Sequence, residues 1–255
     1  MQQPYSSLNE KSPFLRLPIE LRRLIYRSIL PHTTTFDSNG NGAWRMQKTL
    51  PRSDRETGND IVWYRGCTAL LAVNRQVHEE TADMLYGENT FVVDVTFDKI
   101  GFRYRWRTAN QLTPSRMYAF LDHFSQRNLI RVKNYVVNVE SVDDYTGMIK
   151  YNCGGRGLAA GIRGKVQELV DLLAVVPTLQ SLEIHLIDGA ISRLRFPSGR
   201  VHRVQDDANF AQSQMVLDPF RALYGVRKAQ VTGVSKEYTE KLEGSITAQR
   251  GVARS

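Results

Sequence analysis

Cysteine is scarce in this chain of 255 residues, because only Cys67 and Cys153 occur, far apart in the sequence. Secreted domains often carry several disulfides, so two distant cysteines favour a reducing compartment. The opening segment from Met1 to Glu10 is polar and lacks the apolar centre of a secretory signal. No apolar run approaches the ~20 residues that are needed to span a bilayer. These absences predict a cytoplasmic or nuclear protein that has no membrane segment.

Motifs of catalysis and metal binding are also missing. The chain has neither a Gly-x-Ser-x-Gly elbow nor a P-loop. His78-Glu79-Glu80 lacks the second histidine that a zinc-binding helix needs one turn later, and the other histidines have no metal-ligand spacing. We therefore predict that the protein is not an enzyme and has no metal and no cofactor. A catalytic Cys–His pair stays open, because residues distant in sequence can meet in a fold.

A glycine-rich stretch at residues 154–161 contains a Gly-x-Gly-x-x-Ala spacing just before a predicted helix. Such a spacing is typical of a dinucleotide-binding loop when it directly follows a strand. The preceding predicted strand ends near Val139, which is too far upstream for that turn. The sequence therefore favours a connecting loop here.

Basic residues outnumber acidic ones by 34 to 26, which gives a formal net charge of +8. This balance suits an acidic partner such as nucleic acid, although the basic residues are spread along the chain. In Phe102–Arg107 three aromatics alternate with three arginines. Strand geometry separates the two kinds, whereas single-stranded nucleic acid needs both on one face. We therefore expect a half-buried strand with arginines on its outer face, and nucleic-acid binding remains the alternative function.

The segment Phe14–Leu30 is amphipathic. Pro18 suits the first position of a helix, where the missing N–H would have no partner, and Pro31 ends the pattern. Apolar residues recur at three- and four-residue steps, and arginines occupy the other side. The apolar stripe comprises Leu21, Leu24, Ile25 and Ile29. It predicts either an exposed docking face or part of the core of this domain, and both interpretations stay open.

Beyond this helix the sequence predicts an α/β fold, with α+β as the alternative. A polar segment at about 32–66 predicts a hairpin or loop that ends in the apolar patch Ile61–Tyr64, and a second helix covers Thr68–Tyr86, with Gly87 as its stop. Helices and strands then alternate, which favours a parallel sheet and a degenerate helix–strand repeat, with a loop at Ile191–Met215. The predicted strands are Phe91–Val95, Phe102–Arg107, Val132–Val139, Leu182–Ile187 and Ala229–Val234, and the further helices are Pro114–Arg127, Gly164–Val176, Phe220–Tyr224 and Ser235–Ala248.

Two segments resemble the signatures of fungal F-box-like proteins. Leu17-Pro18-Ile19-Glu20-Leu21, followed by Ile25 and Leu30, is similar to the opening of an F-box: a Leu-Pro pair, a Glu and spaced aliphatics. The stretch Ala69–Glu80, with its Arg-Gln step, runs on to a Tyr-Gly-Glu-Asn-Thr-Phe ending at residues 86–91 and resembles the second signature of these proteins. Residues 31–68 separate the two, a longer distance than in a compact F-box.

The resemblance implies a protein-interaction module, the substrate-recognition adaptor of a cullin–RING (SCF-type) ubiquitin ligase. Residues 12–95 would form the F-box-like helical region with its polar insertion, and residues 96–248 an α/β region that binds an unknown target protein. A Skp-type adaptor would dock on the first helix, at Leu17, Pro18, Leu21, Ile25 and Ile29.

We also expect the two signature segments to form one helical unit, because each has an apolar stripe that needs a partner. In this arrangement the stripe of the first helix, Leu21, Leu24, Ile25 and Ile29, would pack against Leu70, Val73 and Val77.

Overall fold

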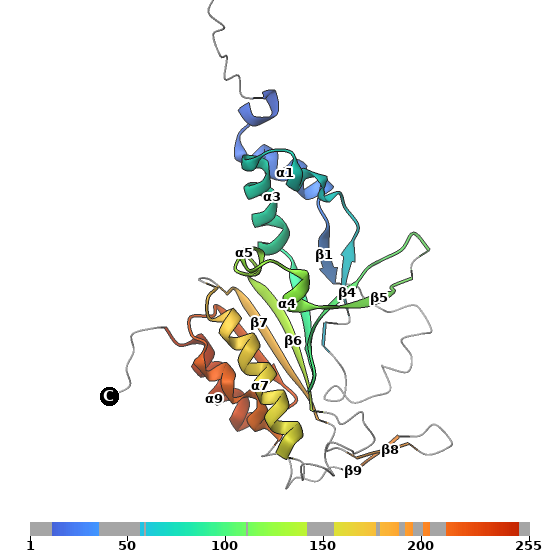
Figure 1. Cartoon of the computed structure of the whole chain (residues 1–255), viewed down its shortest axis with the longest axis vertical. Coiled ribbons are helices and arrows are strands. Elements are labelled where there is room, and N and C mark those ends of the chain that lie inside the picture. Colours follow the sequence, from blue (N-terminus) through green and yellow to red (C-terminus); the bar gives the residue numbers. More distant parts are fainter. Residues whose placement is uncertain are drawn as a thin grey trace, which may run out of the picture.

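The computed structural model describes residues 12–35, 57–58, 60–110, 112–141, 156–176, 179–188, 192–195, 201–204 and 213–249. The chain has an α/β fold built on a mixed sheet of six strands. Figure 1 shows this sheet with helices packed against it and a helical unit that projects from one end. Residues 156–161 of the glycine-rich stretch form the first turns of helix α7 (Arg156–Leu173), so the predicted connecting loop is wrong over these residues. Residues 154–155 and most of the polar insertion lie outside the described residues.

The sheet combines four parallel strands with an antiparallel hairpin. Its strand order is β10 (Lys228–Thr232), β7 (Ser181–Asp188), β6 (Asn134–Ser141), β3 (Thr90–Val95), β4 (Ile100–Arg105) and β5 (Ser115–Ala119). The first four strands run parallel to one another, and β4 and β5 are antiparallel to their neighbours. Parallel neighbours need crossover connections, which explains the helix–strand alternation in the sequence.

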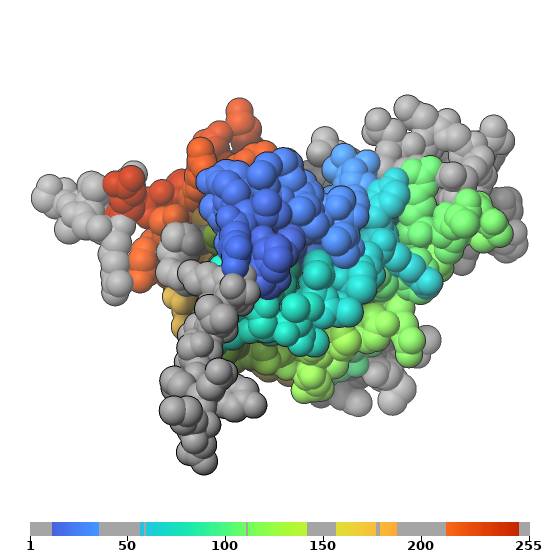
Figure 2. All heavy atoms as spheres, turned by 90° about the horizontal axis from the view of Figure 1, so that it is seen from above, coloured from blue at the N-terminus to red at the C-terminus, as the bar shows by residue number. Residues whose placement is uncertain are grey.

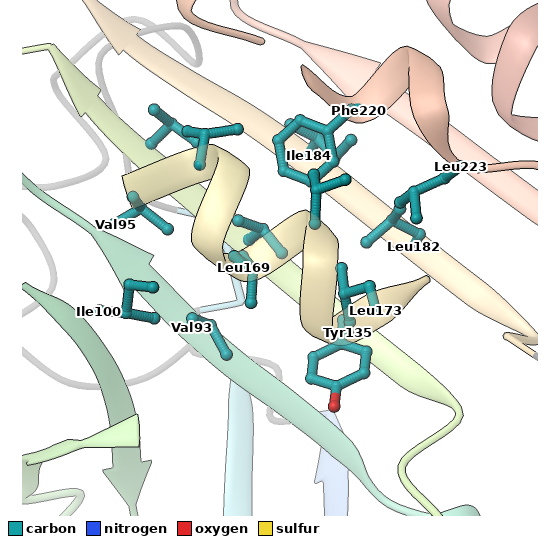
Figure 3. Packing of buried hydrophobic residues seen from close by; sticks show 14 of the residues in the cluster. Val93, Val95, Ile100, Tyr135, Leu169, Leu173, Leu182, Ile184, Phe220 and Leu223 are labelled. Atoms are coloured by element: carbon teal, nitrogen blue, oxygen red, sulfur yellow. The ribbon is translucent and has the colours of Figure 1, made fainter. Parts of the chain in front are cut away.

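The main core lies between one face of the sheet and the helices. The register aligns Val93, Val137 and Ile184 on the same face, and each is completely buried. Helix α7 (Arg156–Leu173) crosses this face and inserts an apolar stripe that includes Leu169 (Figure 3). The 3-10 helix η5 (Met215–Ala222) and helix α9 (Lys236–Thr247) complete the cover.

The remaining elements lie mainly before β6. They are η1 (Pro13–Arg16), α1 (Ile19–Ile29), η4 (Thr68–Ala72), α3 (Arg75–Gly87), α4 (Phe120–His123) and α5 (Gln126–Leu129), with two small antiparallel pairs, β1 (His32–Thr35) with β2 (Ile61–Tyr64) and β8 (Ser192–Arg195) with β9 (Val201–Val204). The first pair confirms the predicted hairpin at the ends of the insertion. Its strand β2 extends the main core, because Trp63 packs edge-on against Phe91.

Several predicted elements differ from the observed ones. Residues 115–119 form strand β5 instead of the first part of a Pro114–Arg127 helix, because they pair with β4. A hairpin, β8 with β9, occurs inside the predicted loop Ile191–Met215. The helix predicted over Thr68–Tyr86 is divided where the Asn74 side chain caps α3 by accepting from the Val77 amide. Pro18 is the N-cap of α1, one residue before the position that the sequence predicted.

The arginines of β4 are not all on an outer face. Arg103 is buried, and its guanidinium lies 2.7 Å from the Asp94 carboxylate on the neighbouring strand β3. Asp94 also accepts from Asn138 of β6, so the second face of the sheet carries a buried polar network.

The predicted region boundary after residue 95 falls between β3 and β4, and the two predicted regions therefore share one sheet. Among the described residues, no helix is long and apolar enough to cross a membrane.

Candidate protein-docking site

Helix α1 is attached to α3 through a buried ion pair. The Arg22 guanidinium donates to both carboxylate oxygens of Glu80, at 2.9 and 2.6 Å, and to the Leu17 carbonyl at 2.5 Å. The Tyr26 hydroxyl donates to the same carboxylate at 2.9 Å. The Arg22 side chain is 8% exposed and that of Glu80 is 16% exposed. A buried charge is tolerated only when it is paired and hydrogen-bonded, and both conditions are met here.

This arrangement changes the acidity of its members. Hydrogen bonding from Arg22 lowers the pKa of Glu80 to about 2, and donors from Gln76 and Tyr26 act in the same direction. Burial, together with the hydrogen bond to Glu80, raises the pKa of Tyr26 to about 12. The carboxylate therefore stays charged and the phenol stays neutral over the physiological pH range, which keeps the bonds between α1 and α3 intact.

Residues of the second signature attach the rest of the unit. Glu88 accepts from Arg23 and Arg27, which binds the outer side of α1 to the end of α3. Asn89 accepts from the Thr33 amide at 2.6 Å and donates to the Leu85 carbonyl at 2.7 Å, so it joins β1 to α3. The signature thus has a structural explanation within this chain, since its polar residues hold α1 and β1 in place.

The two helices form one unit, as expected, and Val77 and Leu70 take part in it as predicted, but α1 contributes other residues than those of its predicted stripe. The small core between them consists of Tyr26, Leu30, Val77 and Met84, with Leu70 packed against it. Of the predicted contact residues, Leu21, Leu24, Ile25 and Val73 are exposed. The prediction assigned the arginine side of α1 to water, which is wrong because Glu80 compensates the charge of Arg22 and lets that side face α3.

The apolar stripe of α1 consequently faces away from the protein. Leu24 is 60% exposed, Leu21 47%, Ile25 39% and Ile19 37%. Leu21, Leu24 and Ile25, the α1 stripe, lie on the side of the helix away from Tyr26, whereas Ile19 is the first residue of the helix and lies on nearly the same side as Tyr26. Figure 2 shows the segment that contains η1 and α1 in blue at the surface of the molecule. A run of exposed aliphatics on one helix is typical of an interaction surface, whereas single exposed aliphatics need no explanation.

The residues predicted for adaptor docking only partly coincide with this surface. Leu21 and Ile25 belong to the α1 stripe, and Pro18 is exposed at its start. Leu17 and Ile29 are half-buried at the two ends of the helix. Leu24, the most exposed member, and Ile19 were absent from the predicted site, although the same three- and four-residue spacing that selected Leu21 would have included Leu24.

Seven of the described arginines are paired with carboxylates of this chain. In addition to the pairs above, Arg131 bridges Glu79 and Asp83, Arg127 contacts Glu79, and Arg221 lies 3.3 Å from Asp218. Each pair reduces the positive field that would attract a phosphate backbone. These seven arginines therefore contribute little to a surface that could bind nucleic acid.

Within the described ranges, no group of three or more His, Cys, Asp or Glu side chains could hold a metal ion. His78, the first residue of His78-Glu79-Glu80, hydrogen-bonds to the Leu71 carbonyl through Nδ1 at 2.7 Å and so lies against η4.

Comparison of the whole chain with protein families, curated proteins and solved structures finds no match.

Proposed function

We propose that this protein is an interaction module that docks on a partner through the α1 stripe, and that the partner is the Skp-type adaptor of a cullin–RING ubiquitin ligase. The observation that carries the proposal is the exposure of Leu21, Leu24 and Ile25 on a helix that is otherwise fixed by buried polar bonds. The resemblance of Leu17–Leu21 to the opening of an F-box supports the choice of partner.

The two faces of α1 have different proposed roles, one in attaching the helix and one in binding the partner. The face with Arg22 and Tyr26 holds the helix in place, so the opposite face can bind a partner without loss of the fold. The α/β region would then present a target protein to the ligase, and the module itself would have no catalytic activity. With two distant cysteines, we infer a cytoplasmic or nuclear location.

The test is binding of the purified adaptor to the wild-type protein and to the double variant Leu21→Ala, Leu24→Ala. Removing apolar anchors from an interface typically costs 2 kcal/mol or more, so we expect roughly a thirtyfold or greater loss of affinity. The matched control is Leu112→Ala, because Leu112 is also an exposed leucine, 65% exposed, but lies in the β4–β5 hairpin.

Both leucines of the double variant are exposed, so circular dichroism and the melting temperature should stay at wild-type values. Wild-type protein that fails to bind the adaptor at micromolar concentration would contradict the proposal. So would a double variant that binds as tightly as the Leu112→Ala control.

A further inference from the structure

The two edge strands of the six-stranded sheet, β10 and β5, differ in whether another element covers them. At one edge, α9 covers β10: Glu243 accepts from the Val231 amide at 2.7 Å, and the Thr239 hydroxyl donates to the Val231 carbonyl at 3.4 Å. Side chains of α9 therefore hydrogen-bond to the amide and the carbonyl of Val231 on this edge strand. Capping of this kind prevents another strand from pairing there.

The other edge, at β5, is left open by the described part of the chain. Alternate residues of an edge strand direct their N–H and C=O groups away from the sheet. The ladder hydrogen bonds of Ser115–Ala119 go to β4, and the described chain contributes no other hydrogen bond to these five residues. Four of the five are exposed, and Figure 1 shows β5 beyond β4, on the side away from β6 and β7.

Strand β5 has only part of the usual protection of an edge: it is short and carries the charged Arg116, but its five residues include no proline, lysine or bulge. Proteins commonly place proline, lysine or a bulge on an exposed edge strand. The sequence Ser-Arg-Met-Tyr-Ala has neither proline nor lysine, and its five residues pair with β4 in an unbroken register. Met117 is 42% exposed and gives the edge an accessible apolar side chain.

The side chains of β5 indicate what a paired strand would carry. Arg116 and Tyr118 lie on one face, and the Arg116 guanidinium lies 5.2 Å from the centre of the Tyr118 ring. Among the described residues Arg116 has no carboxylate partner. Met117 lies on the opposite face. A strand added beside β5 would therefore place alternate side chains beside a positive charge and beside an apolar surface.

We propose that β5 receives an extended segment of a partner protein as a seventh strand, and that this segment alternates acidic with apolar residues. Main-chain hydrogen bonds to the open edge would supply affinity, and the acidic side chains beside Arg116 would supply selectivity. This site lies on a different element from the α1 stripe, so the inference does not rest on the adaptor proposal.

A second copy of this chain fits the edge less well. Stable dimers bury about 1,200 Å² or more, and an edge of five residues contributes a small part of that. A segment of a partner needs no larger surface, because main-chain hydrogen bonds supply the affinity of a peptide that pairs with a sheet edge.

The test uses a fluorescent peptide of alternating Glu and Val, about ten residues long, which exceeds the usual length of a strand. We expect full-length protein to bind it, and the Arg116→Glu variant to bind roughly tenfold more weakly, because an attractive pair becomes a repulsive one. The same variant should gain affinity for a matched peptide of Lys and Val. The control is Lys228→Glu, which changes an exposed basic residue on the capped strand β10.

A second measurement identifies the main-chain contacts. Peptide binding should slow amide exchange within residues 115–119, and a peptide with alternate backbone amides methylated should not bind. Three results would overturn the inference: no binding of the acidic peptide up to about millimolar concentration, equal affinity of the Arg116→Glu and Lys228→Glu variants, or concentration-dependent dimerisation that protects β5 without peptide.

Discussion

The helical unit and the α/β layer are stabilised by different means. Among the described residues, the apolar cluster of the layer has 33 buried members, including Leu85 from α3, whereas the cluster between α1 and α3 has four. The unit relies instead on the Arg22–Glu80 pair, the Tyr26 hydroxyl and the two arginine bonds to Glu88. A region held by a few specific polar bonds does not need its aliphatic residues inside. This comparison explains why α1 can present leucines to the surface.

The largest expected effect on stability is that of a cavity in the apolar core of the α/β layer. Phe220 is completely buried between η5 and the sheet, so Phe220→Ala should lower the free energy of unfolding by about 3–5 kcal/mol. Because this core supports the whole fold, chemical denaturation should shift as a single transition. A loss below about 1 kcal/mol would mean that the layer tolerates cavities better than its packing indicates.

An intermediate and local effect should follow from Glu80→Ala. The variant leaves a buried guanidinium and a buried hydroxyl without their partner, at a cost of about 3 kcal/mol or more. Amide exchange should speed up in α1 while β6 and β7 keep their protection. Glu240→Ala is the control, because its pair with Lys236 in α9 is exposed and 3.9 Å long. Equal loss of protection in α1 and β6 would contradict the distinction between the two regions.

The smallest expected effect is a loss of stability of α1 when the pH is lowered. The pKa of Glu80 is lowered in the folded protein from 4.5 to about 2, so its stabilising contribution is complete above pH 4.5 and is lost as the pH falls towards 2. The protection of α1 should therefore decrease across this window. In Glu80→Gln the group facing Arg22, Tyr26 and Gln76 no longer titrates, so α1 should lose this part of its pH dependence. If the two proteins had identical profiles, the carboxylate would not be the cause.

Apolar runs were sufficient to predict the parallel strands of the sheet. The runs around Val93, Val137 and Ile184 are strands, because a parallel strand covered by helices reads as a continuous apolar segment. The amphipathic pattern of residues 236–247 likewise predicted α9. The orientation of α1 was not predictable in this way, because Glu80, which draws Arg22 inward, lies far along the chain. Strand β5 was missed because its pairing with β4 overrides a local pattern that also suits a helix.

The pairing of β1 with β2 affects how far the segment between them can vary in length. Their register holds Thr35 opposite Ile61, and Thr33 and Trp63 connect the pair to α3 and to the main core. The ends of the intervening segment are therefore already together, and each doubling of a connecting loop costs only about 0.6 kcal/mol in closure entropy. Thr57 is hydrogen-bonded to Asn138 of β6, so segments of very different length, or a whole inserted domain, could be accommodated between Thr35 and Thr57 while the α1 stripe keeps its position.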